Sequence, residues 1–179
     1  MLNQVLLLLA IALTIFFAYV ATRPAAFSIS RTAVIPAPPA NVFALVNDFH
    51  QWDHWSPWAK LDPNSKATFD GAASGVGAKF AWSGNNKVGA GNMAITESRP
   101  HELIKLDLNF TRPMTASNVT VFTFQPEGNG TRVTWTMSGN HNFVGKLFNV
   151  FVNCDKMVGG QFEQGFANLA AVVSGAAKV

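Results

Sequence analysis

The segment from Asn47 to Pro63, NDFHQWDHWSPWAKLDP, carries the residue types best suited to chemistry in this chain of 179 residues. It holds His50 and His54, four residues apart, with Asp53 beside the second histidine. On a helix this spacing would place two imidazoles on one face, as a metal site requires. No third ligand follows at a recognisable spacing, and the sequence has no HExxH pattern. The residues therefore predict no metal site and no cofactor.

The same segment holds three of the five tryptophans, Trp52, Trp55 and Trp58, spaced by three residues. A helical or 3₁₀ turn would place them on one side, where three indole rings bury a large apolar area. We interpret them as a structural plug over one end of the core. The alternative is that one of them, Trp55 above all, contacts a bound ligand.

Groups that could catalyse a reaction are sparse. An enzyme needs a general acid or base inside its cavity, but the strand faces predicted to point inward carry no ionisable side chain. Glu163, between Phe162 and Phe166, is the best carboxylate and is expected at a rim. Cys154 is expected to be a small core residue, because no histidine is predicted nearby. We predict no catalytic residue.

The elements that must position these groups follow from hydrophobic periodicity. Alternation predicts a strand over 27–35, and helical spacing after Pro39 predicts a short helix. Further strands are predicted over 78–84, 91–100, 102–110, 118–126 and 131–139, the last two joined by the turn EGNG. The class is α+β, with five or six strands after the short helices forming an antiparallel sheet with one apolar face.

After Asn142 the period changes to that of one long C-terminal helix. Its apolar residues step by threes and fours, with one double step: Leu147, Phe151, Val158, Phe162, Phe166, Leu169 and Val173. Gly159 and Gly160 are expected to kink or split it near the middle. This helix is the element long enough to cover the apolar face of the sheet.

Residues 1–22 contain no charged side chain and are long enough as a helix to cross a bilayer. We expect residues 1–22 to be an uncleaved anchor, 23–26 a linker and 27–179 one domain. A cleaved signal peptide is the alternative, but no basic residue opens the segment and its end lacks small residues at the cleavage positions. Arg23 and Arg31 after the span favour a cytoplasmic domain.

The net charge of +3 comes from scattered residues rather than from a basic run. A nucleic-acid partner is therefore not expected, since such partners select a basic patch or stripe. Cys154 is the single cysteine and cannot form an intramolecular disulfide.

Five segments carry a family resemblance: IPAPPANVFALVNDFHQWDHWSPW, GVGAKFAWSGN, VGAGNMAITESRP, VFTFQPEGNGTRVTWTMSG and DKMVGGQFEQGFANL. In this order they resemble the START-like, or SRPBCC, superfamily, in its polyketide cyclase/dehydrase-like branch. The resemblance implies a helix-grip fold: a curved antiparallel sheet around a long C-terminal helix, with an apolar cavity between them. It also implies a single-pass location in a bacterial inner membrane, because some bacterial members of the branch carry such an N-terminal span.

The implied cavity leads to a set of expected ligand-binding residues. The apolar candidates are Trp55, Phe80, Trp82, Leu106, Phe110, Trp135, Phe162 and Phe166, and the polar candidates are Asn118, Thr120 and Glu163. The expected function is a membrane-tethered binding module for a hydrophobic small molecule or lipid. A polyketide cyclase or dehydratase, and a protein-interaction role like that of chaperone-ATPase activators, remain the alternatives.

Overall fold

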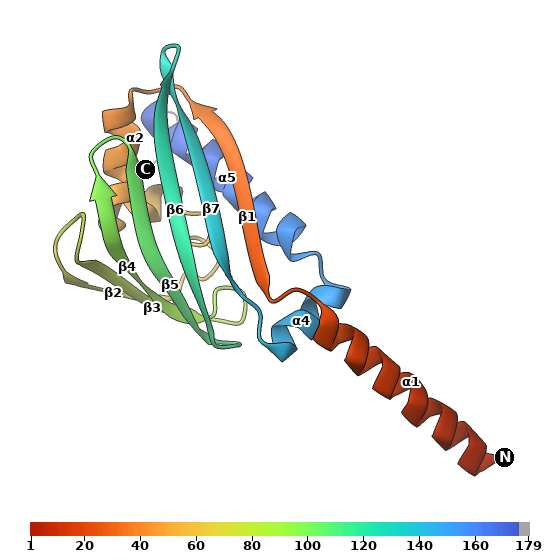
Figure 1. The fold of residues 1–179 in the computed structure, drawn as a ribbon. Coiled ribbons are helices and arrows are strands. Elements are labelled where there is room, and N and C mark those ends of the chain that lie inside the picture. Colours follow the sequence, from red (N-terminus) through yellow and green to blue (C-terminus); the bar gives the residue numbers. More distant parts are fainter. Residues whose placement is uncertain (176–179) are drawn as a thin grey trace.

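The computed structural model describes residues 1–175. It is an α+β helix-grip fold, in which a curved seven-stranded antiparallel sheet holds a long C-terminal helix on one face. The strand order is β1-β7-β6-β5-β4-β3-β2, so that the first strand pairs with the last. The predicted α+β class and helix-grip fold are thus confirmed (Figure 1).

The helices are α1 (Leu2–Thr22), α2 (Pro39–Asn47), the 3₁₀ turn η1 (Phe49–Gln51), α3 (Trp52–Trp55), α4 (Phe143–Phe151) and α5 (Cys154–Val173). The strands are β1 (Ala26–Ile35), β2 (Lys66–Gly71), β3 (Ala78–Ser83), β4 (Ala90–Arg99), β5 (Leu103–Arg112), β6 (Ala116–Glu127) and β7 (Gly130–Asn140).

The two faces of the sheet differ in chemistry, as alternation requires. The inner face carries Ile104, Leu106, Phe122, Val133 and Trp135, all of them buried. The outer face of β1 and β7 carries hydroxyl pairs: Ser30 with Thr136, and Thr32 with Thr134, each 2.8 Å apart between side-chain oxygens. One face therefore builds the core and the other meets solvent.

Helix α5 lies behind β7 and β1 in Figure 1 and packs mainly against β1 and the short helices. It does not run over β2 and β3, which form the opposite edge of the sheet. On the inner face, Phe80 and Trp82 of β3 and Leu108 and Phe110 of β5 are only half-buried.

The predicted C-terminal helix is divided into two, but not at its glycine pair. The break falls at Val152 and Asn153, where the Asn153 side chain accepts a hydrogen bond from the Lys156 backbone N–H and begins α5. Gly159 and Gly160 lie within α5. Gly159 is buried against the Arg31 guanidinium, which occupies the place of its missing side chain.

Helix α1 projects away from the sheet, and Val20 is the buried residue within it (Figure 1). Within residues 1–175 it is the one helix long and apolar enough to cross a membrane. It ends at Thr22, and β1 begins at Ala26.

Candidate functional site

The short helices hold two of the three tryptophans of the plug by their ring nitrogens. Trp52 Nε1 donates to the Val46 carbonyl at 2.9 Å, and Trp55 Nε1 donates to the Leu45 carbonyl at 3.0 Å. Both acceptors lie in the last turn of α2, where helix carbonyls lack partners within the helix. The two indole centroids are 4.8 Å apart, and Trp55 is fully buried. These contacts support the structural interpretation of the plug.

Between the sheet and α5 lies a direct aromatic stack. The Trp135 ring on β7 lies against the Phe162 ring on α5, with centroids 4.1 Å apart and planes 10° apart. Trp135 also approaches Gly165, where an added Cβ would lie 2.9 Å from its ring. Side chains therefore fill the space between β7 and α5, and Gly165 leaves room for the Trp135 ring.

A second aromatic group lies farther along the sheet, and its members are only half-buried. We call Phe80, Trp82, Leu108 and Phe110 the aromatic shelf; it lies on the inner face of β3 and β5. Trp82 stacks on Phe80 with centroids 5.9 Å apart and meets Phe110 edge-on at 5.7 Å. Its Nε1 donates to the Val88 carbonyl at 3.0 Å, which fixes the ring.

Two buried polar atoms without partners lie on the inner face of β6 and β7. Thr120 Oγ1 on β6 and Trp135 Nε1 on β7 are both buried, and neither has a hydrogen-bond partner within residues 1–175. Thr120 pairs with Met137, two residues from Trp135, so the two side chains are diagonal neighbours on the inner face. Asn118, also buried, is two residues from Thr120 on the same face. We call these three residues the polar row.

Strand register connects the polar row to the aromatic shelf. Asn118 on β6 pairs with Leu108 on β5, Leu108 pairs with Met93 on β4, and Met93 pairs with Phe80 on β3. Directly paired residues on one face are in side-chain reach of each other. One continuous strip thus leads from half-buried aromatic rings to buried polar atoms.

The third polar candidate, Glu163, lies outside this strip. Its side chain is largely exposed and accepts a 2.9 Å hydrogen bond from Arg31 Nε. Arg31 Nη2 also donates to Asp155 Oδ2 at 2.9 Å, and these bonds raise the pKa of Arg31 and lower that of Asp155. Arg31 lies on the inner face of β1, where the sequence predicted no ionisable group. Its role is to join β1 to α5.

His50 and His54, the two histidines at metal-ligand spacing, differ in their surroundings. His50 Nδ1 lies 2.8 Å from Asp48 Oδ1 and its ring stacks on Phe69, whereas His54 is exposed. Within the described residues, no three His, Cys, Asp or Glu side chains are grouped to hold a metal ion. Cys154 is half-buried, and burial raises the pKa of its thiol.

Two surface depressions lie away from the Trp135 and Phe162 stack. One, of about 170 Å³, includes Phe49, His50, Phe69 and Lys79 in its lining. The other, of about 540 Å³, is lined mostly by outward-facing residues of β5 to β7, among them Asp107, Asn109, Ser117 and Ser138. Asn118 also lines the second depression.

Among solved structures, similarity extends over most of the chain at low identity. Protein CV1439 from Chromobacterium violaceum matches with a TM-score of 0.60 and 18% identity, covering 82% of this chain and 96% of that one. The Aha1 dimer from Colwellia psychrerythraea matches with a TM-score of 0.56 and 16% identity, covering 80% and 96%. CalU16 from Micromonospora echinospora matches with a TM-score of 0.58 and 16% identity, covering 86% and 78%. These likenesses establish the fold.

The sequence itself gives two further results. It matches no curated protein. A family model described as "Polyketide cyclase / dehydrase and lipid transport" matches residues 26–174, the whole sheet together with α4 and α5. The chain therefore belongs to the polyketide cyclase/dehydrase and lipid transport family.

Proposed function

We propose that this protein is a membrane-tethered binding module that holds a hydrophobic small molecule or lipid on the inner face of its sheet. The observation that carries the proposal is the pair of unpartnered polar atoms, Thr120 Oγ1 and Trp135 Nε1, inside an apolar core. Leaving a buried polar group unpaired costs about 1–3 kcal/mol. A ligand with a polar end that bonds to both atoms would remove that cost.

The apolar part of the ligand would lie on the aromatic shelf. Its four residues are half-buried, and they join the polar row through the Leu108 and Asn118 pair. Ligand sites of this kind are mostly apolar, with a few polar groups that orient the guest. The shelf and the polar row supply these two components at adjacent positions.

The position of the site favours a ligand taken from a membrane. Phe110 of the aromatic shelf pairs with Ala116 at one end of the sheet. At the same end, Ala26 pairs with Asn140, and the chain passes from α1 into β1. Helix α1, as a single-pass anchor, would hold this end toward the bilayer. The family description, which includes lipid transport, also supports a lipid ligand.

Native mass spectrometry of the full-length protein, released from nanodiscs, tests the proposal by identifying what co-purifies. Titration with a fluorescent fatty acid then measures affinity for the wild type and for Thr120→Val, which removes the hydroxyl at nearly constant volume. Loss of one hydrogen bond predicts about 5-fold weaker binding. Thr136→Val is the matched control, since Thr136 bonds to Ser30 on the outer face. Equal affinity of Thr120→Val and wild type, or no binding at all, would refute the proposal.

A further inference from the structure

Helix α4 carries an apolar surface that the rest of the described chain leaves open. Four of its nine residues are exposed large apolar side chains: Phe143, Val144, Phe148 and Phe151, with Phe151 73% exposed. At 100° per residue, all the large apolar side chains of α4 fall within an arc of about 160°. Lys146 and Asn149 lie on the opposite side of the helix. A contiguous apolar surface of this kind marks a contact with a partner or a membrane.

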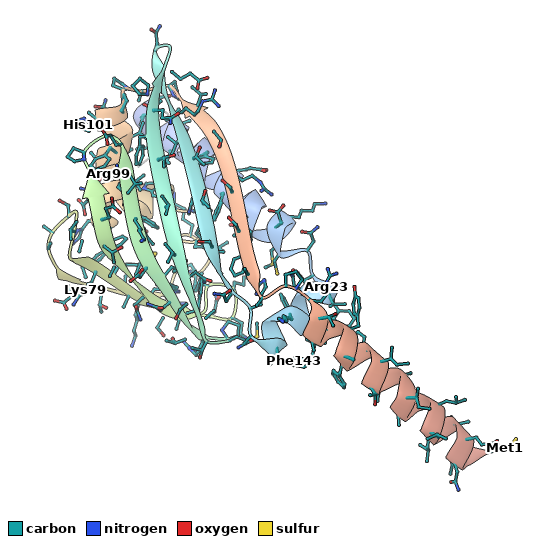
Figure 2. The ribbon with its side chains drawn as sticks, viewed as in Figure 1. Met1, Arg23, Lys79, Arg99, His101 and Phe143 are labelled. Carbon is teal, nitrogen blue, oxygen red and sulfur yellow. The ribbon has the colours of Figure 1, made fainter. Side chains whose placement is uncertain are left out.

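This surface is continuous with α1. The Phe151 ring lies 6.1 Å from the Phe16 ring, and the Phe143 ring lies 6.2 Å from the Phe17 ring, measured between centroids. Lys146 Nζ donates to the Ala21 carbonyl at 3.1 Å, in the last turn of α1. Figure 2 shows Phe143 and Arg23 together at the end of α1 that joins the domain, with Met1 at the far end.

The depth of the α1 residues that contact α4 agrees with the depth to which an in-plane helix inserts into a bilayer. Phe16 and Phe17 precede Thr22 by six and five residues, which at 1.5 Å per residue is about 8–9 Å before the end of the helix. Helices that lie in the plane of a bilayer insert their apolar face by about 5–10 Å. At the end of the span, the Arg23 guanidinium lies 5.5 Å from the centre of the Tyr19 ring. Such aromatic and basic residues are typical of the headgroup level.

We propose that α4 is an in-plane interfacial helix whose exposed apolar side chains enter the bilayer that α1 crosses. The proposal rests on the anchoring role of α1 in the proposed function. It assigns a lipid surface to α4, because the aromatic contacts place its apolar face beside the membrane-spanning part of α1. With α1 across the bilayer and α4 in its surface, the orientation of the sheet would be fixed. The end of the sheet at which Phe110 pairs with Ala116 would then lie at the membrane surface.

Site-directed spin labelling of the full-length protein in phosphatidylcholine and phosphatidylglycerol vesicles tests this placement. In a Cys154→Ser background, one nitroxide is attached in turn at Leu9→Cys in α1, at Phe148→Cys and at Asn149→Cys. Accessibility to oxygen and to a water-soluble nickel chelate then gives the depth of each label. We expect the labels at 9 and 148 to favour oxygen and the label at 149, on the polar side of α4, to favour nickel.

The three labels separate the two proposals. A nickel-accessible label at 148, with a membrane-embedded label at 9, would overturn the role of α4 and leave the anchor intact. A nickel-accessible label at 9 would overturn both. Strong spin–spin broadening at 148 would show a second copy covering α4, and would also overturn the lipid assignment. A label at Phe151→Cys, the most exposed position, must repeat the result at 148.

Discussion

The indole of Trp135 and the phenyl ring of Phe162 lie nearly parallel, 4.1 Å apart between centroids. The first belongs to the sheet and the second to α5, so their contact joins the two layers of the fold. Arg31 forms a second connection between them through Asp155 and Glu163. The aromatic contact is fully buried and the ionic one is partly exposed. We therefore assign most of the stabilisation of this interface to the rings, because surface ion pairs contribute little.

Phe162→Ala should lower the free energy of unfolding by about 3–5 kcal/mol, the range for removing a buried aromatic ring. Chemical denaturation of the full-length protein in a mild detergent would measure the change. Glu163→Ala, the next residue along α5, is the control and should change stability by less than about 1 kcal/mol. A small effect of Phe162→Ala would show that the stack does not hold the layers together.

We also expect the tryptophan plug to stabilise the fold. Trp55→Ala should cost about 3–5 kcal/mol, because the side chain is fully buried and its N–H is paired. His54→Ala, one residue away and exposed, should stay within about 0.5 kcal/mol of the wild type. Comparable losses in the two variants would contradict the structural role of Trp55.

Thr120→Val should have opposite effects on stability and on binding. Without ligand, the substitution removes an unpaired buried hydroxyl, so we expect a gain of about 1 kcal/mol in the free energy of unfolding. Fatty-acid affinity should nevertheless fall, because the ligand loses one hydrogen bond. A loss of stability in Thr120→Val would indicate that the hydroxyl has a partner in the free protein.

His141 predicts a pH dependence of stability. Its ring stacks on Phe27 at 4.4 Å, and partial burial lowers its pKa below the ordinary value of 6.5. As pH falls below 6.5, His141 is protonated in the unfolded chain before it is protonated in the folded chain. The free energy of unfolding should therefore fall as pH drops through the lower folded-state pKa. Thermal midpoints between pH 8 and pH 5 should fall less in His141→Gln than in the wild type. His54→Gln is the control and should keep the wild-type dependence.

The apolar N-terminal helix should remain on the mature protein. Alkaline carbonate extraction should leave the protein in the membrane pellet, and its intact mass should include residues 1–22. A soluble product that begins near Thr22 would identify a cleaved signal peptide. Removal of residues 1–23 should then still leave a folded domain, because β1 begins at Ala26.

Periodicity predicted most of the fold because the inner face is consistently apolar. The strands around Leu106, Phe122 and Trp135 alternate clearly, and each was predicted. Periodicity does not predict strand β2, since all six of its residues are exposed and it is held by pairing with β3 and by the stacking of Phe69 on His50. Local sequence contains no record of that pairing. The glycines predict the break before α5 in the wrong place, because the break depends on the cap formed by Asn153.

The sequence predicts which side chains lie on the inner face of the sheet better than it predicts how they contact one another. Trp135 and Phe162 are both expected to line a cavity, but in the structure their rings are in direct contact. Asn118 and Thr120 are buried on the inner face, whereas Glu163 points to solvent and pairs with Arg31. The unpartnered N–H of Trp135 has no signal in the sequence, because its environment depends on the packing of α5. Such details depend on how far α5 lies toward β1, which no local pattern specifies.

The length of the longest strand has a consequence for any partner of an anchored protein. The turn between β6 and β7, at Gly128, lies at the end of the sheet opposite α1 (Figure 1). Twelve residues of β6 at about 3.3 Å each give up to about 40 Å between the two ends. With α1 in a bilayer, this turn would stay at a nearly fixed distance from the membrane surface while the protein diffuses along the membrane. The turn could therefore contact only molecules that reach the same distance from the membrane.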